Sequence, residues 1–398
     1  MRAPVHRQPK VALVSVGIGR VQRGFERYFA ELHDVLEGEI PVTLFKSAGA
    51  GNGREIVPPM LPLATRFVRA APLHWLERRA RAHTEYYRDC LAFAVMMAPR
   101  LARERFDVIH CIDPPLAFAM RHVKRLARLG SRILFTEGSV IPPDLYPRVD
   151  HIHHVAHDLH ASALAHGIAP GAMTLIPCGV RTSRFPVLDD KAELRRHYGI
   201  APETFVILAV SAVKREHKRV DHIIEEASRL EGDVLLWLDG NPEEGSVVEL
   251  ARQRLGKRVR ITHVPSSEVA SLYRVADVLV HAALQESFGL AIVEAACSGT
   301  PVLAHDTPHF EWLLGDRSRL VDMQARGMLG ARLRAIAAAR EREAAAARAL
   351  AGVLRPRFDW AGLVPGYLEM YARVAAGGPA AARSAPRGAS VLGKADIT

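Results

Sequence analysis

The chain has 398 residues, of which 49% are hydrophobic and 24% charged, so it is long enough for two globular domains and too apolar for a disordered chain. Its longest uninterrupted apolar run, Leu91–Ala98, is much shorter than the ~20 residues that a helix needs to cross a bilayer. Lysine and arginine exceed aspartate and glutamate by ten, which fits a nucleic acid, an anionic membrane surface or a phosphorylated substrate as a partner.

The first ten residues, Met1–Lys10, are basic and lead directly into a strand-like run without the apolar core of a signal peptide. We therefore expect a cytoplasmic protein. Four cysteines are scattered along the chain with no C-x-x-C pair, which argues against a disulfide framework and against a structural zinc site.

Short apolar, β-branched runs alternate with segments of helical length along the chain. Continuous apolar strands followed by helices are typical of parallel sheets covered on both faces. Five strands on each side of a pause between Gly179 and Thr204 predict an α/β fold with two Rossmann-like, doubly wound domains facing a central cleft. The predicted strands are Val11–Gly17, Pro41–Phe45, Asp107–Ile112, Arg132–Thr136 and Met173–Pro177, then Phe205–Ser211, Val234–Leu238, Val259–Val264, Val278–Ala282 and Pro301–Ala304.

The segment Leu63–Phe106 is rich in arginine, with aromatic and aliphatic side chains such as Trp75, Tyr87 and Phe93 between the charges. An amphipathic surface that lies on anionic lipid has this pattern. A pair of core helices with a solvated basic face has it too, and both alternatives stay open. No aromatic stacking module or recognition-helix pattern is visible, so we do not expect nucleic-acid binding.

Five histidines lie close together in the sequence: His151, His153, His154, His157 and His160. In a strand, His153 and His154 point to opposite faces of the sheet, so the five side chains do not converge on one ion. We expect no metal site.

The most informative segment runs from Val278 to Val302. It predicts a strand, a loop that ends at Gly289, and a helix over Leu290–Ser298 that stops at Gly299. The free N–H groups at the start of this helix favour an anion such as a phosphate.

Two carboxylates flank this helix start, Glu286 in the loop and Glu294 inside the helix. Carboxylates repel a phosphate but accept hydrogen bonds from the hydroxyl groups of a sugar and a ribose. A phosphate site between two such carboxylates predicts a nucleotide sugar as the ligand.

The string Glu286-Ser-Phe-Gly-Leu-Ala-Ile-Val-Glu294 resembles the Glu-x7-Glu signature of retaining GT-B glycosyltransferases, in particular glycosyltransferase family 4, the group 1 glycosyltransferases. The resemblance is strong over Phe205–Gly315 and looser before residue 150. It implies that Glu294 holds the nucleotide ribose and that Glu286 contacts the hydroxyl groups of the donor sugar. It also implies donor binding by the residues of the loop and helix start, Ser287, Phe288, Gly289 and Leu290.

The resemblance extends to the basic segment Ala209–Asp221, where Lys218 matches the family's lysine at the leaving diphosphate. Ala212 stands where the family has an arginine, whose charge would come from Arg215 or Arg219.

Further donor contacts implied by the resemblance lie at three other loops. Asp239 and Gly240 correspond to the turn at the nucleotide base, and Gly17 and Gly19 to a loop near the donor phosphates. These first glycines do not form the G-x-G-x-x-G pattern of dinucleotide-binding proteins. Glu137 follows a strand where many members carry a catalytic-loop histidine, so it is a candidate catalytic residue together with Lys218 and Glu286.

We predict four segments from these observations: a first, acceptor-side domain over 1–181, a second, donor domain over 182–357, a C-terminal helix over 358–376 that packs back on the first domain, and a disordered tail over 377–398. Within the second domain, Arg326–Ala351 is predicted to be one mostly solvated helix.

The predicted function is a metal-independent, cofactor-free retaining glycosyltransferase that moves a hexose-type sugar from a nucleotide diphosphate sugar to a hydroxyl of a glycan or lipid-linked, anionic acceptor. Such a reaction suits the biosynthesis of cell-envelope polysaccharide or glycolipid, with peripheral contact at the inner face of an anionic membrane. Two alternatives remain, a non-catalytic protein that binds nucleotide sugars or anionic surfaces, and a nucleotide-sugar epimerase.

Overall fold

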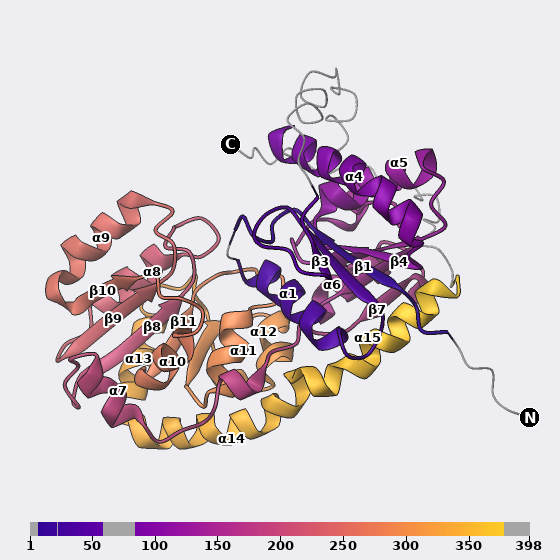
Figure 1. Cartoon of the computed structure of the whole chain (residues 1–398). Helices are drawn as coiled ribbons and strands as arrows, with labels where there is room; N and C mark the ends of the chain where they lie inside the picture. The colour runs from indigo at the N-terminus through magenta and orange to yellow at the C-terminus, as the bar shows by residue number, and fades with distance from the viewer. Residues whose placement is uncertain (1–6, 22, 59–83, 378–398) are drawn as a thin grey trace, which may run out of the picture.

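The computed structural model of the chain describes residues 7–21, 23–58 and 84–377. It contains a seven-stranded sheet in the order β3-β2-β1-β4-β5-β6-β7 and a six-stranded sheet in the order β10-β9-β8-β11-β12-β13, and the strand pairs are parallel. Figure 1 shows the two sheets side by side, each with helices packed around it, and the last two helices running from the second domain back to the first. The prediction of an α/β fold with two doubly wound domains is confirmed.

The first sheet is formed by β1 (Val11–Ser15), β2 (Val42–Lys46), β3 (Glu55–Ile56), β4 (Val108–Cys111), β5 (Arg132–Glu137), β6 (His151–His154) and β7 (Met173–Leu175). Around it lie α1 (Gly24–Leu36), α4 (Thr84–Glu104), α5 (Pro114–Leu126) and α6 (His157–Ala165). The central strands are apolar and buried from end to end, as expected for a sheet covered on both faces.

The second sheet is formed by β8 (Phe205–Val210), β9 (Val234–Asp239), β10 (Val259–Thr262), β11 (Val278–His281), β12 (Val302–His305) and β13 (Leu320–Val321). Its helices are α7 (Lys191–His197), α8 (Val220–Ser228), α9 (Gly245–Leu255), α10 (Val269–Val275), α11 (Leu290–Cys297), α12 (Pro308–Leu314) and α13 (Met328–Ala338). The helices α14 (Arg340–Phe358) and α15 (Trp360–Ala375) complete the described chain.

The prediction of five strands in each domain is wrong, because β3, β6 and β13 are also present. Two of them, β3 and β13, have only two residues each, too few for an apolar run to mark them. The third, β6, reads His-Ile-His-His and is fully buried. Its histidines are compatible with the core because they find hydrogen-bond partners there, such as the Thr174 hydroxyl for His151.

The single solvated helix predicted over Arg326–Ala351 is also wrong. The structure has two helices, α13 and α14, which meet at Ala339 where the backbone leaves the helical region at φ −135°. Each helix buries one side, through Leu329, Leu333 and Ile336 on α13 and through Ala347, Ala351 and Leu354 on α14. Because the alanine side chain is small, a buried stripe of alanines lacks the large apolar residues that mark a buried helix face in a sequence.

The helix α15 returns to the first domain and is held there by buried hydroxyl groups. The Tyr367 and Tyr28 hydroxyls lie 2.8 Å apart, and the Tyr371 hydroxyl lies 2.8 Å from Nδ1 of His110. His110 is also hydrogen-bonded to the Thr136 hydroxyl, which is in turn hydrogen-bonded to His153 on β6. Burial lowers the pKa of His110 well below its usual range, so this row of hydrogen bonds joins α15 to the first sheet through neutral groups.

The helix α4 lies in the arginine-rich segment for which lipid contact and a core position were alternatives. Its side chains Tyr87, Phe93 and Met97 are buried in the core beside α5. The described part of the segment therefore packs as a core helix, while Trp75 lies outside the described residues. None of the helices in the described ranges is both long and apolar enough to pass through a bilayer.

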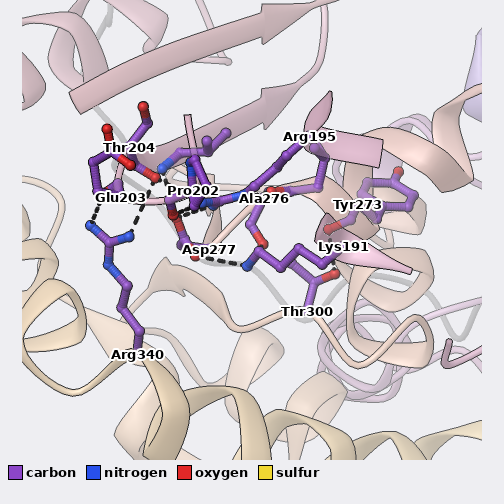
Figure 2. A network of polar contacts seen from close by, with 12 residues as sticks. Lys191, Arg195, Pro202, Glu203, Thr204, Tyr273, Ala276, Asp277, Thr300 and Arg340 are labelled. Carbon is purple, nitrogen blue, oxygen red and sulfur yellow. Dashed lines mark hydrogen bonds and ion pairs between the residues drawn. The ribbon is translucent and has the colours of Figure 1, made fainter. Parts of the chain in front are cut away.

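A buried ion cluster connects α7 to the start of β11 (Figure 2). The Asp277 carboxylate accepts hydrogen bonds from Lys191 and from Arg195, each at 2.7 Å, and from the Val206 N–H at 2.8 Å. The Arg195 side chain is about 6% exposed, so it depends on Asp277 for its only carboxylate partner in the described structure.

Replacing Asp277 by Asn should therefore reduce the free energy of unfolding by about 3–5 kcal/mol, since Arg195 would be left buried without a counter-charge. Urea unfolding followed by circular dichroism measures this loss. The matched control is Asp306→Asn: like Asp277, Asp306 lies next to a strand and pairs with an arginine, but both side chains of that pair are largely exposed. Similar losses in the two variants would contradict the role assigned to burial.

Candidate active site

The carboxyl ends of the second sheet carry most of the residues predicted for the donor. The loop 211–219 follows β8, Asp239 and Gly240 end β9, and the loop from Ala282 to Gly289 joins β11 to α11. Ligands of doubly wound folds bind at this edge of the sheet. The start of α1 lies against the start of α11, because a Cβ on Gly24 would lie 3.3 Å from the Leu290 side chain.

Glu286 is held by two basic side chains from its own domain. Lys218 donates to Oε1 of Glu286, and Nε2 of His281 lies 3.1 Å from the same oxygen. Burial by itself would raise the pKa of Glu286, but the hydrogen bond and charge of His281 and the charge of Lys218 lower it to about 2. Glu286 is therefore ionised at any physiological pH.

The backbone around Lys218 is strained. His217 and Arg219 both have positive φ, at 62° and 49°, in the left-handed region that non-glycine residues rarely adopt. The Val220 N–H bonds the Lys214 carbonyl and closes the loop at the start of α8. Strain of this kind is concentrated at functional sites, where it orients a side chain, and here it accompanies the contact between Lys218 and Glu286.

Glu294 lies in α11 and is 3% exposed. The Tyr273 hydroxyl donates to its Oε2 at 2.8 Å, and Arg27, which belongs to α1 in the first domain, donates to its Oε1. Burial raises the pKa of the Glu294 carboxyl, and the Arg27 charge and the Tyr273 hydrogen bond oppose that rise. The carboxylate is thus shared between the two domains.

The start of α11 requires its glycine. Gly289 has φ 98° at the N-cap, and an added Cβ would lie 3.1 Å from Ile292. The preceding Phe288 side chain is 1% exposed and packs on Phe358, so only its backbone faces the loop. Nε2 of His309 in α12 bonds the Phe288 carbonyl at 2.9 Å and so fixes the loop. Ser287 is half-buried.

The two predicted arginines of the second domain contact other groups than Glu286. Arg215 is largely exposed beside Asp221 and Glu244, and Arg219 donates to the Met323 carbonyl at 2.9 Å. Neither contacts Glu286, so of the three predicted basic residues the structure brings only Lys218 to that carboxylate. 

At the end of β9, Oδ1 of Asp239 accepts from the Thr262 hydroxyl at 2.7 Å and from the Val264 N–H at 3.0 Å. Its neighbour Gly240 has φ 149°, and a Cβ there would lie 2.0 Å from the Ser211 carbonyl oxygen. Asp239 therefore shapes this turn, and Gly240 lets the ends of β8 and β9 approach each other.

The glycine loop of the first domain is equally crowded. A Cβ on Gly17 would lie 2.5 Å from Oε1 of Glu26, and Gly19, at φ 87°, would place one 2.2 Å from the Ala48 carbonyl oxygen. Gly19 therefore needs glycine, because its φ is positive and the clash is with backbone, whereas a side chain at Gly17 would have to displace the Glu26 side chain.

Glu137 ends β5 in the first domain and is fully buried. Its Oε1 accepts from the N–H groups of Ser139 at 2.7 Å and Ile141 at 3.3 Å, whereas its Oε2 has no partner in the described structure. Two nearby buried atoms also lack partners there, the Tyr146 hydroxyl and Nε2 of His154, which is the β6 residue paired with Glu137. Buried polar atoms without partners are uncommon, and three together indicate a place for a hydrogen-bonding ligand or water.

Four residues of this region were not predicted from the sequence: Arg27, Tyr273, His281 and His309. Tyr273 lies within a segment that resembles the family, and His281 ends a predicted strand. Arg27 is 267 residues from Glu294 in the sequence, so no local pattern could have joined the two.

No three His, Cys, Asp or Glu side chains are grouped as metal ligands within 7–21, 23–58 and 84–377.

Comparison with known proteins connects this site to one family. Residues 190–347 match the family model of glycosyl transferases group 1. A D-inositol 3-phosphate glycosyltransferase of Segniliparus rotundus is 30% identical over 232 residues, which are 55% of this chain and 51% of that protein. The corresponding protein of Streptomyces bingchenggensis is 28% identical over 153 residues, 35% of this chain and 34% of its own length. The chain thus spans a third to a half of the curated relatives that it matches.

Solved structures share the whole fold at low sequence identity. Sucrose-phosphate synthase of Thermosynechococcus elongatus superposes with a TM-score of 0.76 at 18% identity, covering 93% of this chain and 100% of that one. Anabaena HepE in complex with UDP-glucose gives 0.71 at 14% identity, covering 92% and 98%. Residues 190–347 therefore match the glycosyl transferases group 1 in sequence, and the chain as a whole has the two-domain GT-B fold of the superposed structures.

Proposed function

We propose that the protein is a retaining, metal-independent glycosyltransferase that moves a hexose-type sugar from a nucleotide diphosphate sugar to an acceptor hydroxyl. The observation that carries this proposal is the pair of glutamates around the start of α11, each held by a basic side chain: the partly buried Glu286 by Lys218 and the buried Glu294 by Arg27. Ionised carboxylates accept hydrogen bonds from sugar and ribose hydroxyls.

The leaving nucleoside diphosphate gains negative charge as the glycosidic bond breaks, and catalysis depends on fixed positive groups at that point. Lys218 and the N-terminal end of α11 supply such charge without a metal ion or cofactor. The family resemblance implies that the leaving phosphate itself takes the proton of the acceptor, so no separate base is required. The complex of HepE with UDP-glucose supports a nucleotide sugar as the donor.

We place the acceptor at the carboxyl end of the first sheet. The partnerless Oε2 of Glu137, the Tyr146 hydroxyl and Nε2 of His154 offer acceptors and donors for a polyol. The curated relatives are named for D-inositol 3-phosphate, an anionic polyol, which supports a hydroxyl-rich and anionic acceptor here.

We also propose that the enzyme works in the cytoplasm, at the inner face of an anionic membrane, on a glycan or lipid-linked acceptor of the cell envelope. Burial, followed by the like charges of Arg148 and Arg125, lowers the pKa of the Arg121 guanidinium in α5 of the first domain. Beside them the Leu126 side chain is 86% exposed at the end of α5. Basic residues around an exposed leucine suit an anionic lipid surface.

Two rivals make different predictions for the same assays. A non-catalytic binding protein would bind donor, as seen by calorimetry, without transferring or hydrolysing it. An epimerase would convert the donor sugar in the absence of any acceptor, which product analysis of donor incubated alone would reveal.

Lys218→Ala and Glu294→Ala should each reduce turnover of the donor by about 10- to 150-fold, the equivalent of one lost charge-assisted hydrogen bond in the transition state. A screen of UDP-, GDP-, ADP- and TDP-sugars by thermal shift identifies the donor for this assay. The control is Lys257→Ala, an exposed lysine at the opposite, amino-terminal end of the second sheet. Wild-type turnover in both site variants would contradict the assignment.

Glu137 should make the protein less stable as the pH rises. Burial raises the pKa of Glu137 from 4.5 to about 7, opposed by hydrogen bonds from Ser139 and Ile141. The folded state therefore resists ionisation: relative to Glu137→Gln, the wild type should lose about 3 kcal/mol of unfolding free energy between pH 4.5 and pH 8, most of it below pH 7.

Denaturant unfolding of both proteins at several pH values measures this difference. Glu286→Gln is the contrasting variant, because the pKa of Glu286 is lowered to about 2, so its carboxylate keeps its charge throughout this range. A constant difference between wild type and Glu137→Gln from pH 4.5 to pH 8 would show that Glu137 is not perturbed.

A further inference from the structure

One face of α1 contacts the second domain. Residues on this face recur every three or four positions, the spacing of one side of a helix. The contacts are Gly24 with Leu290, Arg27 with Glu294, and Glu31 with Arg184 at 3.1 Å. In Figure 1, α1 accordingly lies on the side of the first sheet that faces the second domain.

The contact of Arg27 differs from the others because its partner is a carboxylate of the proposed donor site. Arg27 occupies Oε1 of Glu294 while Tyr273 occupies Oε2, and Glu294 is 3% exposed. The hydroxyl groups of an incoming ligand cannot reach this carboxylate until one of its neighbours moves.

Of the two neighbours, Arg27 is the one that can leave. Tyr273 is fully buried in α10, within the domain of Glu294, whereas the Arg27 side chain is 28% exposed and belongs to the other domain. A buried carboxylate that lost Arg27 without replacement would be left uncompensated. Two adjacent hydroxyls of a ribose would supply replacement hydrogen bonds to the same oxygen.

We propose that Arg27 is a positioning residue that occupies the Glu294 carboxylate in the nucleotide-free protein and is displaced by the ribose of the donor. Donor binding then releases α1 from α11, so the affinity for nucleotide and the contact between the domains are coupled. This inference rests on the proposed function, in which Glu294 receives the ribose.

The test is calorimetric titration of UDP, GDP and ADP into the full-length protein and into Arg27→Gln. Removing the competing guanidinium should tighten binding of the nucleotide that the wild type prefers by about tenfold, the order of one charge-assisted hydrogen bond. A residue needed only for folding would weaken binding or leave it unchanged. Arg27→Lys keeps the charge and should tighten binding by a smaller factor, which maintains the test if Arg27→Gln does not fold.

The matched control is Glu31→Gln, which weakens the contact with Arg184 on the same face of α1 but leaves both hydrogen bonds of Glu294 in place. Its nucleotide affinity should equal that of the wild type. Weaker or unchanged binding by both Arg27 variants would show that Arg27 does not compete with the nucleotide, and equal tightening by Glu31→Gln would show a general loosening of the domains. Either result overturns the inference. Failure of the wild type to bind any nucleoside diphosphate would instead refute the proposed function.

Discussion

A carboxylate that is removed from water needs a positive or hydrogen-bonding partner, and this constraint governs the site twice. Glu286 meets it within the second domain, through Lys218 and His281. Glu294 meets it partly across the domain boundary, through Arg27. The electrostatics of the donor site and the arrangement of the two domains therefore depend on each other.

The structure around these carboxylates holds them in place. His309 bonds the carbonyl of Phe288 from one side, and its Nδ1 lies 3.3 Å from Asp158 of the first domain on the other. On the opposite side of the boundary, Phe25 of α1 packs so closely on Gly138 that a Cβ there would lie 1.9 Å from its ring. Gly138 directly follows Glu137, so α1 contacts both the donor loop region and the loop of the proposed acceptor site.

Much of the fold could be predicted because its strands are buried on both faces and read as continuous apolar runs. No apolar run marks a strand whose buried side chains are polar and hydrogen-bonded, as in β6, whose histidines bond to Thr174, Thr136 and the Ile176 carbonyl. Nor does an apolar pattern mark a helix in which alanine provides the buried side, as in α14.

The sequence likewise predicts one part of the candidate site and not the other. Glu286, Gly289 and Glu294 lie within one short segment, so their spacing carries the pattern. The partners that give these carboxylates their character come from distant positions, Lys218 at a separation of 68 residues and Arg27 at 267. Lys218 could be predicted only from the resemblance to a family. Arg27 could not be predicted, because its pairing with Glu294 exists only once both domains are folded and docked.

Glu294 is expected to exchange the guanidinium of Arg27 for the ribose of a nucleotide. A crystal structure of the protein with a bound nucleoside diphosphate would show this exchange. We expect ribose hydroxyls within hydrogen-bonding distance of Glu294 and the Arg27 side chain withdrawn from it. A ribose bound elsewhere, with the pair of Arg27 and Glu294 intact, would rule the exchange out.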